Sequence, residues 1–479
     1  MTIDRNSDEW RDLQYQISRL YDYQREGVKF GALKPRKING DDMGLGKTAQ
    51  TILSMRINPK PIEIVVAISP SVWVDEFRNW WPSRKITVIE GSGADRRLQL
   101  LYFTRAVKAG TAHPIVMSYS TFRIHAAEIV ELKSKNARIT FDEAHTLRNR
   151  TSLVSKAAMK VAKKNRDLHI NLLSGTILMN TAEDLWPLLV MVDPETYTSF
   201  WNWADTRLSK STVRYGARKI ESFGAPLDPE ALAGELRPYL LRRLKSEVLN
   251  LPPKTYQTIR TELSEDQRRV YNEIKKQWYT LFQNDHEISV TIPVTEILRL
   301  KQICVSTDLI NPNSKTELRG SKIDELDAII EGAGDQKVVV FSQFAVAIRR
   351  LSLKYATTSS GFTGDDEESA RAIAVQKFQS DESIRTFFVT YQAGYSSITL
   401  TRGSIVVLLD KVWNPKTIQQ AIDRVDRISQ TRPVTVIDLQ ANTTLESWIN
   451  EKLDFKTALA DSVVDEDQLA LEYIRSYLG

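Results

Sequence analysis

The stretch Asp41–Ile52, DDMGLGKTAQTI, is the strongest fold signal in the chain. A phosphate-binding loop usually has a glycine, four variable positions and then Gly-Lys-Ser/Thr. Gly46, Lys47 and Thr48 supply the end of this pattern, but Asp41 stands where the first glycine is expected. Such a loop directs backbone N–H groups and a helix N-terminus at phosphate. The stretch therefore predicts a nucleotide site that begins with an unusual acidic residue.

The side chains of this loop predict ATP and Mg²⁺ as cofactors. Lys47 would bring positive charge to the β- and γ-phosphates, and the Thr48 hydroxyl would ligate Mg²⁺. The expected cofactor-binding cradle consists of Met43, Gly44, Leu45, Gly46, Lys47, Thr48 and Ala49. Taken alone, the pattern also fits a helix N-terminus rich in turn residues. The preceding run, residues 34–40 (KPRKING), is expected to be a poor buried strand because it is so polar.

The composition is that of a globular protein with more than one domain. The 479 residues are 42% apolar and 26% charged, and this length exceeds what a single core usually serves. A net charge of +5 permits nucleic-acid binding only through a local basic surface. Cys304 is the single cysteine, so no internal disulfide forms and no zinc spacing exists. Without a signal segment or a membrane-spanning run, we expect a cytoplasmic protein with no membrane partner.

Apolar runs alternate with helical patterns at both ends of the chain. Strands are expected at Ile62–Ser69, Ile86–Glu90, Pro114–Ser118, Ala137–Phe141, His169–Ser174, Lys337–Phe341, Arg385–Thr390, Ser404–Asp410 and Pro433–Leu439. Helices are expected at Lys47–Arg56, Val72–Trp80, Val154–Lys164, Ala345–Lys354, Glu367–Gln379 and Thr417–Ile428. This alternation predicts an α/β fold with two parallel sheets covered by helices on both faces.

The middle of the chain lacks this alternation. From about Pro194 to Arg319 we expect no strand, but two helices, Leu263–Phe282 with Ser264 as its cap, and Val294–Cys304. The expected domains are an ATP-binding lobe at 1–195, a mostly helical insertion at 196–320, and a second lobe with C-terminal helices at 321–479.

Two further motifs end predicted strands of the first lobe. Asp142 and Glu143 follow Ala137–Phe141, at the sheet edge where open α/β folds bind ligands. Asp142 would hold Mg²⁺, and Glu143 would orient and deprotonate the attacking water. The alternative is a surface loop with two acids. Residues 174–176 (SGT) also end a strand and would sense the γ-phosphate, although the tripeptide alone carries no signal.

Arg424 and Arg427 are three residues apart and would share one face of a helix. They could form a solvated face in which Asp423 and Asp426 are their partners. Alternatively, they are arginine fingers that neutralise the transferred phosphoryl group, an effect of about 10³–10⁵ in rate.

In this order, the motifs resemble helicase superfamily two and, more narrowly, the Swi/Snf-type DNA translocases. The resemblance runs from about Leu20 to Leu439, and that family's loop is typically Asp-Glu-Met-Gly-Leu-Gly-Lys-Thr, so Asp41 is its usual residue. Other matching stretches are Leu20–Val28, Ser118–Arg123, Ser174–Asn180, Glu183–Pro194, Leu240–Val248, Leu251–Lys254, Val340–Phe344, Trp413–Pro415 and Asp423–Gln430. The modest length favours a minimal bacterial or phage member.

The resemblance implies two RecA-like lobes that hold ATP between them and step along duplex DNA. It assigns adenine recognition to Gln24 and coupling to Ser174, Gly175, Thr176 and Gln420. The DNA-binding residues it implies are Ser69, Pro70, Trp73, Ser118, Tyr119, Arg242, Arg243, Ser342, Gln343 and Trp413. Arg242 and Arg243 could instead make interlobe contacts, and Trp413 could pack in a core. Contacts to DNA are expected to be mainly to the backbone and independent of sequence.

The chain departs from the family pattern in the segments expected to couple nucleotide and DNA. Ile177 replaces a usual proline, Ser397 and Thr399 replace a glycine and an asparagine, and Asp426 replaces a common histidine. None of these positions is assigned to phosphate, metal or water.

A basic run follows the acidic pair. Its cations could contact DNA phosphates, which would make binding salt-dependent, or they could form a solvated helix face. The run consists of Lys156, Lys160, Lys163, Lys164 and Arg166.

The function expected is an ATP-dependent motor on double-stranded DNA, acting in repair, recombination, replication or the remodelling of DNA-bound complexes. The alternatives are a strand-separating DNA or RNA helicase, and a nucleic-acid clamp that uses ATP only to switch shape. We expect a monomer, with an unidentified protein recruiter as a further partner.

Overall fold

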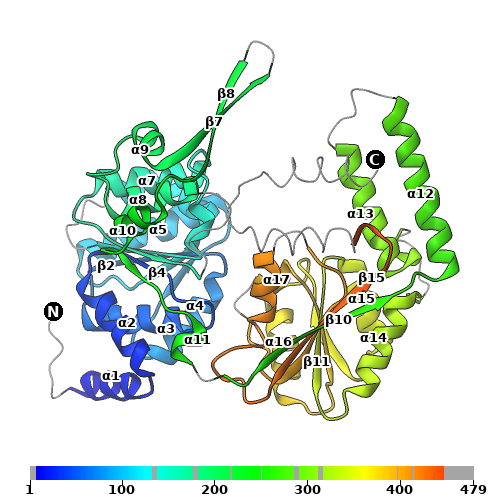
Figure 1. Ribbon diagram of the computed structural model, residues 1–479. Coiled ribbons are helices and arrows are strands. Elements are labelled where there is room, and N and C mark those ends of the chain that lie inside the picture. Colours follow the sequence, from blue (N-terminus) through cyan, green and yellow to red (C-terminus); the bar gives the residue numbers. More distant parts are fainter. Residues whose placement is uncertain are drawn as a thin grey trace. The chain divides into compact units, whose positions relative to one another are not determined.

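A computed structural model of the chain describes residues 7–131, 137–175, 182–215, 218–249, 251–284, 291–310, 317–395, 398–412 and 415–446. The chain divides into two compact units, Met1–Leu249 and Asn250–Gly479. Figure 1 shows a sheet flanked by helices in each unit. The expected fold class, two RecA-like parallel-sheet lobes, is confirmed, whereas the three-part domain division remains a prediction.

The first unit is built on a seven-stranded parallel sheet in the order β3-β4-β2-β5-β6-β1-β9. The strands are β1 Arg36–Asn39, β2 Ile62–Ala67, β3 Thr87–Ile89, β4 Ile115–Ser118, β5 Ala137–Asp142, β6 His169–Leu173 and β9 Leu240–Leu241. Consecutive residues of β2 are buried against different cores, as expected of a strand covered on both faces.

Helices cover both faces of this sheet. One layer contains α3 Lys47–Ile57 and α4 Pro70–Trp80, with α1 Asp8–Ser18 and α2 Asp22–Leu33 outside α3. The other layer contains α5 Gly93–Lys108, α6 Tyr119–Glu131, α7 Leu153–Lys164 and α8 Trp186–Val192. The expected helices Lys47–Arg56, Val72–Trp80 and Val154–Lys164 are thus confirmed.

The prediction for residues 34–40 is wrong, because β1 is a fully buried strand. Its two cations are satisfied by main-chain carbonyls. The Arg36 guanidinium donates to the carbonyls of Met191 and Asn165, each at 2.7 Å, and Lys37 Nζ donates to that of Lys34 at 2.7 Å. Burial lowers the pKa of both side chains. Polar composition therefore did not prevent burial, since main-chain carbonyls supply the acceptors, from distant segments for Arg36 and from nearby residues for Lys37.

The prediction that residues 194–319 contain no strand is also wrong. After α9 Phe200–Arg207, strands β7 Leu208–Tyr215 and β8 Arg218–Pro226 form an antiparallel hairpin that projects from the first unit in Figure 1. Helices α10 Pro229–Leu236 and α11 Lys245–Val248 flank β9. Strand β10, Lys254–Thr261, lies in the second sheet, where it pairs with β15 along its whole length. As an edge strand it is mostly exposed, so it lacks the apolar run of a buried strand.

The second unit has a six-stranded parallel sheet in the order β10-β15-β14-β11-β13-β12. Its remaining strands are β11 Lys337–Ser342, β12 Ser359–Phe362, β13 Thr386–Thr390, β14 Gly403–Leu408 and β15 Val434–Ala441. Helices α14 Ser321–Gly332 and α15 Ala345–Lys354 pack on one face, and α16 Glu368–Ser380 and α17 Pro415–Ile422 on the other.

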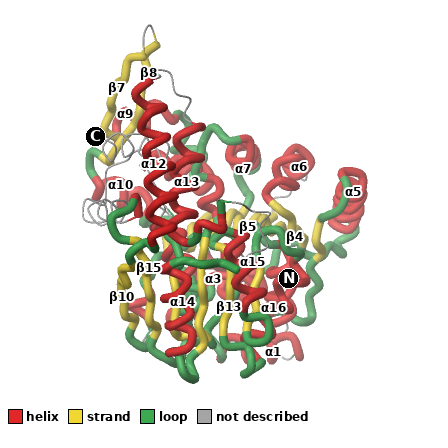
Figure 2. Tube along the Cα trace, turned by 90° about the vertical axis from the view of Figure 1, so that its right-hand side faces the viewer, coloured by secondary structure: helices red, strands yellow, loops and turns green. Residues whose placement is uncertain are grey.

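Two long helices complete the second unit. Helices α12 Glu265–Asn284 and α13 Thr291–Val305 lie side by side in Figure 2 and share a small core with the end of β15. Ser264 Oγ accepts from Gln267 N at 3.3 Å, which confirms Ser264 as the cap of α12. No helix in the described ranges is long and apolar enough to cross a membrane.

The expected helix Thr417–Ile428 is wrong in its second half, because α17 ends at Ile422. Tertiary contacts use the carbonyls that a longer helix would need. The carbonyl of Arg424 accepts from Leu400 N at 2.8 Å, and that of Val425 accepts from the Gln430 side chain at 3.1 Å. Arg424 and Arg427 therefore lie in consecutive turns and not on one helical face.

Candidate nucleotide site

Two glycines give the loop between β1 and α3 its shape. Gly44 has φ 84° and Gly46 has φ 79°, and α3 begins directly afterwards at Lys47. The left-handed backbone of Gly46 favours glycine, and a Cβ there would lie 2.4 Å from Gln24 Nε2 and displace the end of that side chain. The loop thus ends at a helix N-terminus, the usual arrangement for binding an anion.

Lys47 and Gln24 lie against the main chain of this loop. Lys47 Nζ donates to the carbonyls of Asp41 at 2.8 Å and Asp42 at 3.2 Å. The Gln24 amide donates to the carbonyl of Leu45 at 3.1 Å and accepts from Tyr21 N at 3.1 Å. Both predicted cofactor-binding side chains are therefore placed at the loop.

The acidic residue at the start of the loop is half of a buried ion pair. Asp41 has no exposed surface, and its two carboxylate oxygens accept from Arg243 Nε at 3.0 Å and Arg243 Nη2 at 2.5 Å. Gln50, on α3, also donates to Asp41 at 3.2 Å. Arg243 was predicted to contact DNA. The structure packs its side chain against the loop, with 9% of its surface exposed.

Main-chain hydrogen bonds accompany this ion pair. Gly40 N donates to Leu241 O at 2.7 Å and Asp42 N to Arg243 O at 3.0 Å. Lys245 N donates to the Asp42 carboxylate at 3.1 Å. The segment that contains β9 therefore continues beside the loop and fixes its course from a point some 200 residues later in the chain.

Asp142 ends β5 and is held by two aromatic side chains. Trp73 Nε1 donates to Asp142 Oδ2 at 2.8 Å, and Tyr119 OH donates to Asp142 O at 2.7 Å. Trp73 is fully buried and Tyr119 nearly so. Both residues were predicted to contact DNA. The structure instead packs them behind the acidic pair, where they position Asp142.

The acidic pair has an unusual electrostatic and backbone environment. Burial, with the neighbouring charge of Glu143, raises the pKa of Asp142 to about 6, while the positive charge of Lys47 opposes this shift. Glu143 has φ 54° and ψ 54°, a left-handed conformation that costs a non-glycine residue roughly 1–3 kcal/mol. Such strain often occurs at functional sites, and here it sets the direction of the Glu143 side chain.

A short polar chain connects the acidic pair with the end of β6. His145 Nδ1 lies 3.2 Å from Glu143 Oε2 and 3.4 Å from Ser174 Oγ. A Cβ on Gly175 would come 2.5 Å from Met43 Cγ and 3.4 Å from Lys47 Nζ. The predicted coupling residues Ser174 and Gly175 therefore contact both the acidic segment and the loop. Thr176 lies outside the described residues.

In the second unit, the predicted arginines contact the segment that carries two of the departures from the family pattern, Ser397 and Thr399. Arg424 Nε donates to Gly394 O at 3.0 Å. Arg427 Nη1 donates to Thr399 Oγ1 at 2.7 Å and to Ile398 O at 3.2 Å. Thr399, which replaces a common asparagine, is thus a direct partner of Arg427.

Other predicted residues of the second unit surround a buried carboxylate. Ser342 Oγ donates to the side chain of Asp410, and Gln343 N donates to the same carboxylate at 3.0 Å. Gln420 is buried, and its Oε1 has no hydrogen-bond partner among the described residues. Trp413 lies outside the described residues, and its DNA contact stays a prediction.

The remaining predicted DNA contacts lie at the surface of the first unit. Ser69 and Pro70 begin α4 and Ser118 ends β4, and all three are partly exposed. The Arg242 side chain is 42% exposed and donates to Gly40 O at 3.0 Å. These residues remain available for nucleic-acid contact, which stays a prediction.

Sequence patterns give no indication of the partners of Asp41 and Asp142. Arg243 and Trp73 belong to stretches assigned to DNA by resemblance, and only the folded chain brings them to these carboxylates. Asp410 ends an expected strand and carries no motif of its own. A residue-spacing rule does not find such contacts, because each joins segments far apart in the sequence.

Comparison with known families agrees with this geometry. Residues 23–309 match the SNF2-related domain, and residues 321–429 match the helicase conserved C-terminal domain. The chain belongs to the SNF2 family. The Swi/Snf resemblance read from the motifs is confirmed.

The SNF2-family chain is similar to longer proteins from very different organisms. It is 28% identical over 480 residues to a SWI/SNF-related, actin-dependent regulator of chromatin from Mus musculus, covering 94% of this chain and 44% of that protein. It is 29% identical over 470 residues to an uncharacterized ATP-dependent helicase from Mycoplasma genitalium, covering 94% of this chain and 43% of that protein. The chain therefore spans less than half of the length of either relative.

Among solved structures, the SWI2/SNF2 ATPase core of Sulfolobus solfataricus in complex with dsDNA is similar over 92% of each chain, with 24% identity and a TM-score of 0.42.

Proposed function

We propose that this SNF2-family chain is an ATP-dependent motor that translocates on double-stranded DNA. The observation that carries the proposal is the convergence of Lys47, Asp142 and Glu143 at one edge of the first sheet, where the charge of Lys47 acts on Asp142. This arrangement supplies a phosphate cradle and an acidic pair side by side, as ATP hydrolysis requires.

The donor set fits a magnesium nucleotide. The Thr48 hydroxyl and the Asp142 carboxylate are oxygen ligands of the kind that Mg²⁺ prefers, and Mg²⁺ neutralises phosphate charge when it is bound. Gln24 would read the adenine edge, because it lies beside the loop and already donates one hydrogen bond to Leu45 O. Glu143 would orient and deprotonate the attacking water, and Arg424 and Arg427 would stabilise the transferred phosphoryl group.

Duplex DNA is proposed as the track because the chain is similar to chromatin and helicase-type ATPases over nearly its whole length. Ser69, Ser118 and Arg242 offer hydroxyl and guanidinium groups at the surface, a set suited to phosphate, and Pro70 lies beside Ser69 at the start of α4. Ser174 and Gly175, which contact both the loop and the acidic segment, would report the state of the nucleotide. The motor would act as a monomer, brought to its site by a protein recruiter.

Steady-state ATP hydrolysis tests this function. Turnover is measured with no nucleic acid, single-stranded DNA, blunt duplex DNA and RNA, with Lys47→Ala as the matched inactive control. We expect strong stimulation by blunt duplex that is absent from the control. Stimulation only by single strands or RNA would favour a strand-separating helicase, and absence of turnover in every condition would favour a nucleic-acid clamp.

A further inference from the structure

Helix α7 of the first unit carries a ridge of cations, which we call the α7 ridge. Its members are Lys156, Lys160, Lys163 and Lys164, all exposed. Their spacing places them on one side of the helix, while Ala158, Val161 and Ala162 pack into the core.

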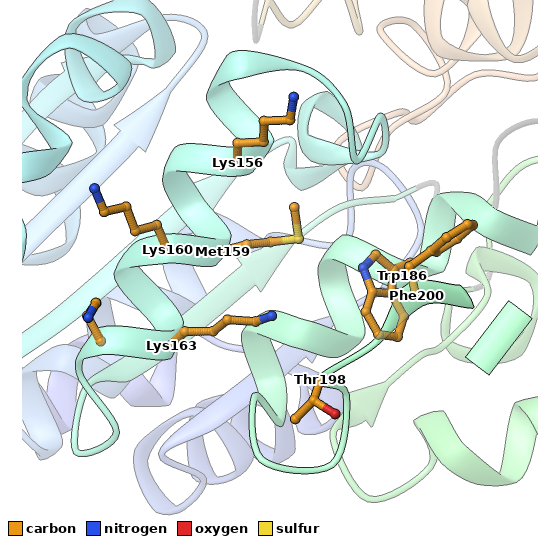
Figure 3. A pocket seen from close by; sticks show the side chains of 8 residues that line it. Lys156, Met159, Lys160, Lys163, Trp186, Thr198 and Phe200 are labelled. Atoms are coloured by element: carbon orange, nitrogen blue, oxygen red, sulfur yellow. The ribbon is translucent and has the colours of Figure 1, made fainter. Parts of the chain in front are cut away.

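The α7 ridge borders a surface pocket of about 420 Å³. Figure 3 shows Lys156, Lys160 and Lys163 projecting from one helix, with Trp186 and Phe200 on neighbouring elements. The two aromatic rings pack edge to face with centroids 5.7 Å apart and are nearly buried, so they form a fixed wall. The pocket therefore has a rigid apolar side and an adaptable cationic side.

Among the described residues, no carboxylate pairs with the lysines of the α7 ridge. No acidic residue lines the pocket, and none of the four lysines forms an ion pair within the described part of the chain. Two basic neighbours do have partners, since Arg166 pairs with Glu195 at 3.0 Å and Arg150 lies 3.8 Å over the Phe200 ring.

An ordinary solvated helix mixes charges of both signs, as α12 does. There, Arg269 pairs with Asp266 at 3.4 Å and with Glu273 at 3.7 Å. Helix α7 contains no acid at all. Because like charges at this spacing repel one another, the α7 ridge gains most from a bound polyanion.

The α7 ridge is also separate from the nucleotide site. The buried residues of α7 face the core that includes Ile64 and Val66 of β2, whereas α3 faces Val65 and Ala67 on the other side of the sheet. Lys163 and Lys164 lie at the end of α7 that precedes β6, near the amino edge of the sheet. Ser69 and Ser118 lie at the carboxyl edge, after β2 and β4.

We propose that the α7 ridge binds the phosphate backbone of a second nucleic-acid segment, distinct from the duplex that stimulates ATP turnover. This inference rests on the proposed function in assuming that a first duplex is bound elsewhere. Lys156 to Lys163 spans about 10 Å along the helix, and phosphates on one strand of B-DNA recur about every 3.4 Å along its axis, so the ridge contacts roughly two or three of them. Lysines act as point charges, so no sequence preference is expected.

The test compares a ridge variant with a charge-matched control. The ridge variant carries Lys156→Gln, Lys160→Gln, Lys163→Gln and Lys164→Gln. The control carries four changes at exposed lysines elsewhere, Lys29→Gln, Lys85→Gln, Lys108→Gln and Lys377→Gln. Equilibrium binding of a short blunt duplex and of a four-way junction is measured over a range of salt concentrations for both variants and the wild-type protein. Thermal unfolding confirms that each variant is folded.

We expect the slope of log affinity against log salt for the junction to decrease by about 2 in the ridge variant, because each phosphate that a cation neutralises contributes roughly 0.9 to this slope. The slope for the short duplex should match that of the control. A junction slope equal to that of the control would overturn the proposal. Equal decreases on both substrates would overturn it too, because the ridge would then lie on the path of the stimulating duplex.

Two further outcomes distinguish a failure of this proposal from a failure of the proposed motor function. If polyglutamate binds the wild-type protein but not the ridge variant while the junction slopes are unchanged, the ridge binds an acidic protein and the proposal is wrong. If DNA does not stimulate ATP turnover in the wild-type protein, the proposed motor function fails, whereas a ridge-dependent junction slope would still show a nucleic-acid site.

Discussion

The two units hold their functional side chains in different ways. In the first, Asp41 is fixed by a buried ion pair with Arg243, and Asp142 by the indole of Trp73. In the second, Arg424 donates to Gly394 O, and Arg427 donates to Ile398 O and Thr399 Oγ1. Asp41 and Arg243 attract each other as opposite charges in addition to their hydrogen bonds, which a neutral acceptor cannot provide. The phosphate loop is therefore held by a buried pair of opposite charges, whereas the contacts described for Arg424 and Arg427 have neutral acceptors.

The largest expected effect tests the second unit. Arg427→Ala or Arg424→Ala should lower ATP turnover by about 10³–10⁵-fold, because each arginine would stabilise charge in the transition state. Nucleotide affinity should change little, since the loop lies in the first unit. A fluorescent ATP analogue and a coupled hydrolysis assay measure the two quantities.

Arg432→Ala is the control for both arginine variants, because Arg432 forms an exposed ion pair with Asp335 at 3.4 Å. A decrease below tenfold in both arginine variants would mean that the arginines serve only to hold Gly394, Ile398 and Thr399, and the contrast between the units would disappear.

The next effect concerns the first unit. Glu143→Gln should reduce turnover by about 10²–10⁴-fold, because the amide no longer accepts a proton from water. ATP should still bind, since the loop and Asp142 are intact. Single-turnover hydrolysis together with a binding titration distinguishes the two steps. Unchanged turnover would show that Glu143 is not the base.

The third effect compares neighbouring arginines in stability. Arg243→Ala leaves the Asp41 carboxylate buried without its counter-charge, which typically costs about 3–5 kcal/mol of unfolding free energy. Arg242→Ala removes a half-exposed side chain and should cost at most about 1 kcal/mol. Urea unfolding followed by tryptophan fluorescence measures both values. Equal costs would refute the idea that the ion pair fixes the loop.

The smallest effect is a pH dependence at the amino edge of the first sheet. Burial, and the positive charges of Lys60 and Arg138, lower the pKa of His169 to about 4. The unfolded chain therefore binds a proton more readily than the native chain between about pH 6.5 and 4, and stability decreases as the pH falls through this range. After allowance for solvent screening at this half-buried site, His169 should contribute roughly 1–2 kcal/mol of this decrease.

His169→Gln is the comparison for the pH effect, because glutamine does not titrate. Its unfolding free energy should change less than that of the wild-type protein between pH 6.5 and 4. If both proteins lose the same stability over this range, the titration of His169 does not cause the loss.

Local patterns predict much of this molecule. The alternation of apolar runs and helices gives both parallel sheets, and the loop motif gives the start of α3 at Lys47. Sequence patterns do not predict strand β1, because the charged residues Arg36 and Lys37 are not expected to be buried. Main-chain carbonyls that accept from their side chains make this burial possible. Sequence patterns do not predict edge strand β10 either, because it is mostly exposed and lacks an apolar run.

The functional side chains are harder to assign than the elements that carry them. Asp142 and Glu143 follow from their positions at the end of β5, and Lys47 follows from its position at the start of α3. Trp73, Tyr119 and Arg243 are assigned to DNA by resemblance, yet they are buried behind the nucleotide site. Burial depends on contacts between distant segments, which single-sequence patterns do not encode.

The ion pair between Asp41 and Arg243 has a consequence for how the protein is made. As the chain leaves the ribosome, every motif of the phosphate loop and the acidic pair emerges long before Arg243 does. Until then, β1 lacks its neighbour β9, and Asp41 has no counter-charge. The nucleotide site of a nascent chain therefore assembles late, when translation has reached the first residues of the second unit. A fragment that stops before β9 would carry the phosphate loop and the acidic pair and still lack the ion pair that fixes the loop.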